Sequence, residues 1–99
     1  MHPDAFRATL ADPAPPPGLS DALEALWWDG KGDWDRSHQC AQRDDGPAGC
    51  AVHAYLHRKE GDLSNARYWY ARAGRAMPTA SLEQEWNDLV RALLQETGP

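Results

Sequence analysis

Residues 50–78 read CAVHAYLHRKEGDLSNARYWYARAGRAMP, and this stretch decides the fold of the chain. Small residues recur along it at helical spacing, and Gly61-Asp62 interrupts it near the middle. A glycine permits a tight turn, and an aspartate directly after it is a good N-cap for a new helix. We therefore expect one helix over about 47–59 and a second over about 63–75, joined as a hairpin.

An earlier segment carries a weaker copy of the same pattern. Gly32-Asp33 precedes the equivalent glycine–aspartate pair by 29 residues, and each pair is followed by a large apolar residue, two polar residues and a small residue. The first copy predicts helices over about 21–30 and 33–43. Self-similarity on this scale is typical of stacked helical hairpins.

A fifth helix and a proline-rich N-terminus complete the expected architecture. Ser81-x-x-Gln84 is a capping-box pattern, and the apolar residues after it follow helical spacing. Successive prolines in the first residues disfavour helix and favour extended chain. We expect an all-α protein with a flexible tail over 1–18 and a single helical-repeat domain over 19–99. That domain would contain two antiparallel hairpins and a C-terminal capping helix.

The second hairpin resembles the tetratricopeptide repeat. The motif combines small residues, a Gly-Asp turn, an alanine four residues before an aromatic, and a closing proline; the matching positions are Ala54, Gly61, Asp62, Ala66, Tyr70, Ala73 and Pro78. The period is shorter than the usual length of about 34 residues. The resemblance covers about residues 21–78 and implies a non-catalytic module that binds a protein or peptide. Residues 53–62, 65–70 and 72–74 are also similar to segments of small bacterial proteins with no assigned activity.

The overall charge narrows the classes of partner. A net charge of −5 disfavours nucleic acid, because such a binder needs a basic face, and it disfavours an electrostatic membrane anchor. No apolar run is long enough to span a bilayer, and the N-terminus lacks the apolar segment of a secretory signal. Cys40 and Cys50 match neither a disulfide scaffold nor a Cys-x-x-Cys metal site, so we expect reduced thiols in a cytoplasmic protein.

His53 and His57 are the residues most open to a chemical role. They lie four apart on one helix face, as metal ligands often do, with Glu60 near that face. His38 should lie close if the hairpins pack as neighbours, and Tyr70 offers a hydroxyl. Three interpretations stay open: packed histidines with satisfied hydrogen bonds, a polar pocket formed by these five residues, and a divalent-metal site on His53, His57 and Glu60. A zinc-protease pattern is missing, so hydrolysis is not supported.

Tyr55, Arg58 and Lys59 are the candidate partner-binding residues, because tetratricopeptide domains expose a concave groove at these positions. Their cationic groups would pair with an acidic or C-terminal peptide. Consecutive aromatic residues such as Tyr68 and Trp69 cannot share one helix face, so an outward aromatic would instead suit a structural homodimer. The sequence holds no pattern for nucleophilic catalysis or for a cofactor other than a divalent metal. It therefore favours binding to a protein, a peptide or itself over an enzyme built on the histidines.

Overall fold

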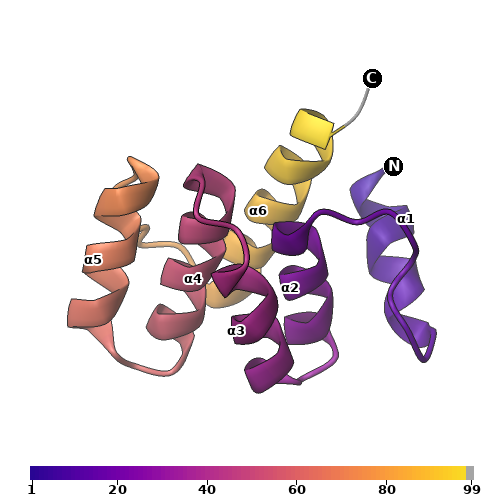
Figure 1. The fold of residues 1–99 in the computed structure, drawn as a ribbon, viewed down its shortest axis with the longest axis horizontal. Helices are drawn as coiled ribbons and strands as arrows, with labels where there is room; N and C mark the ends of the chain where they lie inside the picture. The colour runs from indigo at the N-terminus through magenta and orange to yellow at the C-terminus, as the bar shows by residue number, and fades with distance from the viewer. Residues whose placement is uncertain (98–99) are drawn as a thin grey trace.

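The computed structural model describes residues 1–97, and this part of the chain is all helical, which confirms the predicted fold class (Figure 1). None of the helices described is both long and apolar enough to cross a bilayer. In chain order the elements are α1 (Pro3–Ala8), a short 3-10 turn (Thr9–Ala11), α2 (Asp21–Gly30), α3 (Trp34–Gln42), α4 (Pro47–Lys59), α5 (Leu63–Ala73) and α6 (Leu82–Thr97).

Local capping chemistry explains where most helices begin. The side chains of Ser20, Asp33, Asp62 and Ser81 each accept a hydrogen bond from the backbone N–H three residues further on. The capping box at α6 is only half formed, because the Gln84 side chain donates to a residue one turn ahead instead of turning back.

The two predicted Gly-Asp turns have the same geometry. Gly32 and Gly61 adopt φ values of +83° and +88°, a left-handed conformation that favours glycine. After each glycine, the aspartate N–H donates to the carbonyl five residues earlier, at 2.9 Å in the first turn and 3.0 Å in the second. The internal repeat in the sequence is therefore also a repeat of backbone structure.

Helices α2 and α3 form one pair and α4 and α5 form the next, each joined by a short turn (Figure 1). Small residues let the paired helices approach closely: Ser37 donates to the Ala25 carbonyl at 2.5 Å, and Ala54 is buried with Ala66. Helix α6 packs on α2 and α4 and closes the core. Trp86 of α6 donates its indole N–H to the Leu26 carbonyl of α2 at 2.9 Å.

The prediction that the N-terminal segment is extended is wrong for residues 3–8. Pro3 occupies the first turn of α1, where its missing N–H costs nothing, and the other prolines come only after the helix. Phe6 is fully buried, with its ring 6.0 Å from that of Trp86. Thr9 accepts a hydrogen bond from the Trp27 indole at 3.1 Å. The segment is thus packed against α2 and α6.

Candidate functional site

Three histidines from two helices meet between the hairpins. His53 and His57 lie one turn apart on α4, and His38 reaches them from α3, which packs against α4. One ring nitrogen from each histidine lies within 4.8 Å of the other two. The ring centroids are 4.5 Å apart for His38 and His53, and 4.8 Å apart for His53 and His57. We call these three residues the histidine cluster.

Two tryptophans hold the histidine cluster in place. Trp34 stacks on the His38 ring with centroids 4.8 Å apart, and Trp69 stacks on the His53 ring at 3.9 Å. The Trp34 indole N–H donates to a carbonyl of α4 at 3.1 Å, which fixes its orientation. Sequence reasoning did not include these tryptophans in the site. The sequence did indicate one of these contacts. Trp34 and His38 are four residues apart on one helix, so their side chains are neighbours on its surface.

Burial keeps two of the imidazoles neutral. His53 is only 5% exposed, and desolvation lowers its pKa to about 4, helped by the neighbouring His38, His57 and Arg72. Desolvation also lowers the pKa of His38, with His57 adding to the effect while Glu60 opposes it. At neutral pH both rings therefore carry a free nitrogen lone pair, which is the form that binds metals.

The third histidine is oriented by a carboxylate. Nδ1 of His57 lies 2.6 Å from Oε1 of Glu60, so Nε2 is the nitrogen left for another partner. A carboxylate on the outer nitrogen is the usual support of a metal-ligating histidine. Asn65 adds an amide nitrogen 3.4 Å from Nε2. His57, Glu60 and Asp62 also form a second, more exposed group of close donor atoms.

A cavity of about 200 Å³ adjoins the histidine cluster at His53 and Trp69. Its other wall is the end of α3 and the turn after it, formed by Ala41, Gln42, Asp44 and Asp45. His38 is half-buried. The cluster is therefore mostly buried, and His53 is the member of it that lines the recess.

Tyr70, which the sequence suggested as part of the same pocket, belongs elsewhere. Its hydroxyl donates to Oε2 of Glu85 at 2.5 Å, and Arg58 donates to Oε1 of the same carboxylate at 2.7 Å. Arg58 also donates to the Ala80 carbonyl. Desolvation and the Glu85 hydrogen bond raise the pKa of Tyr70 well above its ordinary value. These groups link α4, α5 and the start of α6.

The expectation that Tyr55, Arg58 and Lys59 form an exposed surface is wrong for Tyr55 and Arg58. Tyr55 is 2% exposed, and its hydroxyl donates to Asp29 of α2 at 2.6 Å. Arg58 is bound to Glu85 as described above. Lys59 keeps a 40% exposed side chain, although its ammonium lies 2.8 Å from Asp29. The acidic partners sit on other helices, so the sequence around these three residues could not reveal them.

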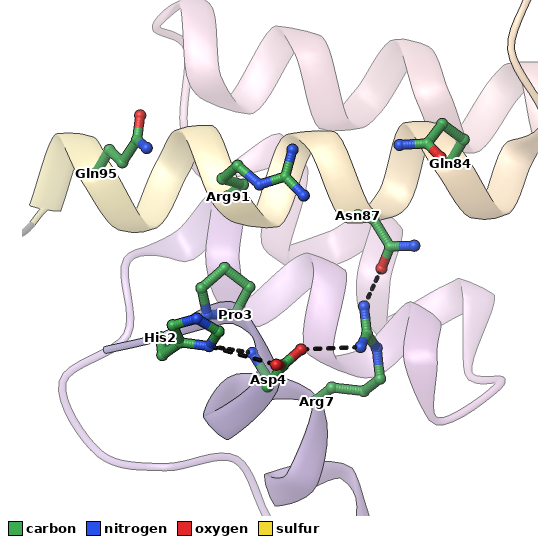
Figure 2. Close-up of a pocket in the computed structure, with 8 residues that line it drawn as sticks. All are labelled: His2, Pro3, Asp4, Arg7, Gln84, Asn87, Arg91 and Gln95. Carbon is green, nitrogen blue, oxygen red and sulfur yellow. Dashed lines mark hydrogen bonds and ion pairs between the residues drawn. The ribbon is translucent and has the colours of Figure 1, made fainter.

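Helix α1 narrows the face where a peptide groove was expected. A recess of about 330 Å³ remains between Leu10, Lys59 and Trp86. Figure 2 shows a larger cleft, of about 510 Å³, between α1 and α6. There Arg7 reaches Asn87 across the cleft and also pairs with Asp4 at 3.3 Å. The exposed charges of Arg7 and Asp4 are therefore paired with each other in this cleft.

The lowered pKa of His53 predicts a loss of stability in acid. Unfolding restores the ordinary pKa of 6.5 from the folded value of about 4, so protons favour the unfolded chain. The stabilisation is complete above pH 6.5 and is lost as the pH falls towards 4. We expect this single group to account for up to about 3 kcal/mol of that loss.

The measurement is urea unfolding at pH 7 and pH 4 for the natural chain and for His53→Phe. The free energy of unfolding falls between pH 7 and pH 4 in both proteins, because carboxylates titrate in both. The part of this fall that is present only in the natural chain is the contribution of His53. An equal loss in both proteins would show that His53 is not held neutral by burial.

A comparison with known protein families, with curated proteins and with solved structures finds no match for this chain.

Proposed function

We propose that this protein binds one divalent transition-metal ion through the imidazoles of His38, His53 and His57. The observation that carries the proposal is the convergence of three ring nitrogens within 4.8 Å of one another. The tryptophans on either side limit how far the rings can turn away. Imidazole is a good ligand for zinc, copper, nickel and iron.

The separation of the nitrogens is compatible with a bound ion. Two imidazole nitrogens on a tetrahedral zinc are about 3.4 Å apart, given zinc–nitrogen bonds of 2.0–2.1 Å. The cluster would therefore contract slightly on binding, by small ring rotations. Glu60 favours this outcome, because its bond to Nδ1 of His57 leaves Nε2, which lies 3.4 Å from the Asn65 amide nitrogen, as the nitrogen that would bind the ion.

Two other interpretations of these residues have less support. Stacked histidines and tryptophans would also pack as a purely structural aromatic cluster, but packing alone does not require a nitrogen of each ring to lie within 4.8 Å of the other two. The peptide-binding role implied by the tetratricopeptide resemblance takes second place, because Tyr55 and Arg58 are engaged within the fold.

The test is a titration with Ni²⁺ at neutral pH, followed by tryptophan fluorescence. Ni²⁺ quenches nearby indoles, and Trp69 lies against a ligand ring. We expect saturation at one ion per chain, and a dissociation constant about 100-fold higher or more in His38→Ala, because one of three ligands is lost. His38 is half-buried, so this variant should fold.

His2→Ala is the matched control, because His2 lies on α1 as an exposed N-cap and outside the cluster. The proposal fails if Ni²⁺ leaves the fluorescence unchanged, or if His2→Ala weakens binding as much as His38→Ala does.

A further inference from the structure

Helix α5 and the loop after it carry positive charge with no acidic residue among them. Residues 63–82 contain three arginines, Arg67, Arg72 and Arg75, and no aspartate or glutamate. The whole chain has ten basic and fifteen acidic residues, so this stretch is the cationic part of an acidic molecule. All three arginines are exposed.

These three arginines also differ from the others in having no carboxylate partner. Each of the other five arginines of the chain lies within 3.9 Å of a carboxylate oxygen. Within the part of the chain that the structure describes, Arg67, Arg72 and Arg75 form no ion pair. The helix dipole favours a cation in the last turn, which accounts for Arg72 but not for Arg67 in the middle of α5.

Apolar side chains lie beside these charges. The exposed large apolar residues among those described are Met1, Leu63 and Tyr68, and the last two belong to α5. The Tyr68 side chain is prominent, since the residue is 57% exposed. The guanidinium of Arg72 lies 5.9 Å from the centre of the Tyr68 ring and 4.8 Å from that of Trp69. These contacts order the Arg72 side chain before any partner binds.

The exposed residues share one side of the helix. Residues four apart are neighbours on a helix surface, which places Arg67 and Ala71 in one row and Tyr68 and Arg72 in the next, with Arg75 just beyond the helix end. We call these five residues the arginine face. Helix α5 packs on α4 and is the outermost helix at its end of the molecule (Figure 1). None of the described helices therefore covers the arginine face.

We infer that the arginine face is a docking surface for an acidic segment of another protein, in which carboxylates stand next to an apolar side chain. A guanidinium matches the two oxygens of a carboxylate and forms strong hydrogen bonds with an ionised acceptor. Tyr68 supplies the apolar contact between the charges. This docking surface is independent of the proposed metal binding.

Two other occupants fit the charges less well. A symmetric contact between two copies through α5 would bring like charges together, which is costly. A single-stranded nucleic acid would pair with arginines and stack on Tyr68, but it is charged at every nucleotide. Glu60 and Asp62 are exposed in the turn before α5, so a strand that extends past the face would be repelled there. A peptide can confine its carboxylates to the face.

The experiment measures the fluorescence anisotropy of a labelled peptide of glutamate and leucine as the full chain is added. A second peptide has glutamine in place of every glutamate, and a labelled oligouridylate is the nucleic-acid probe. We expect saturable binding of the glutamate peptide that weakens with added NaCl, because salt screens exposed charges. The glutamine peptide should bind about tenfold more weakly, because it loses the charge-assisted hydrogen bonds.

Arg67→Glu tests the face itself. Arg67 is exposed and forms no ion pair within the fold, so the variant should keep its helical structure, which circular dichroism checks. We expect its dissociation constant for the glutamate peptide to rise about tenfold, because repulsion replaces attraction. Arg91→Glu is the matched control, since it changes the net charge equally at an exposed site on α6. It should change the constant by less than about twofold.

Four outcomes would overturn the docking surface. The first is no binding of the glutamate peptide, and the second is tighter binding of the oligouridylate than of that peptide. The third is an equal loss in Arg67→Glu and Arg91→Glu, which would indicate a general attraction and not a defined face. The fourth is a dimer of the natural chain, seen by analytical ultracentrifugation, that Arg67→Glu dissociates, because the face would then belong to a second copy.

Discussion

Glu85→Ala is expected to lower the free energy of unfolding by about 3 kcal/mol, a large share of the stability of a domain of this size. The Glu85 side chain is 7% exposed and receives hydrogen bonds from Arg58 and Tyr70. Its removal leaves a mostly buried guanidinium and a buried hydroxyl without their acceptor. Breaking one side of a buried ion pair costs far more than the intact pair contributes.

Urea unfolding checks this prediction, with Asp88→Ala as the matched control. Asp88 lies one turn further along α6, where it is exposed, pairs loosely with Arg91 at 3.7 Å and accepts a hydrogen bond from the exposed Gln84 side chain at 2.8 Å. Its loss should cost less than about 0.5 kcal/mol. Similar values for the two variants would contradict the buried network that joins α4, α5 and α6.

Phe6→Ala is the second change with a large expected effect, again about 3 kcal/mol. The Phe6 ring is fully buried although it lies in a segment that the sequence marks as a loose tail. Truncation would leave a cavity against Trp86. It would also weaken the attachment of α1, which Lys31 supports through bonds to the Leu10 and Asp12 carbonyls at 2.8 and 3.0 Å.

Thermal unfolding of Phe6→Ala and of Asp4→Ala separates a packed segment from a loose one. Asp4 lies on the same short helix, but its carboxylate is exposed and forms only surface contacts. We expect Asp4→Ala to be nearly neutral. Phe6→Ala with equally little effect would mean that the first residues do not belong to the core.

The helices of the repeat were predictable because their ends depend on neighbouring residues. Asp33 and Asp62 cap the helices that follow them, and each preceding glycine adopts the left-handed turn that the sequence implied. Helix α1 was missed for the opposite reason. The burial of Phe6 depends on Trp86, which lies 80 residues away along the chain, and no local pattern reports such a contact.

The site was only partly predictable. The spacing of His53 and His57 placed both rings on one face, and the repeat suggested that His38 lies nearby, as the structure has it. The sequence did not indicate which distant residues would bind the side chains of Tyr55 and Arg58. Tyr55 and Arg58 are bound to carboxylates 26 and 27 residues away, so two residues that looked suited to a partner serve the fold itself.

The most direct test of the account is the long-range proton–nitrogen NMR spectrum of the histidine rings, recorded before and after one equivalent of Zn²⁺. A metal bond shifts the resonance of the ring nitrogen that forms it. We predict that His38, His53 and His57 change together and that His2, an exposed histidine outside the cluster, does not. Unchanged ring nitrogens in the cluster, or a change confined to His2, would contradict the proposal that these three imidazoles form a metal site.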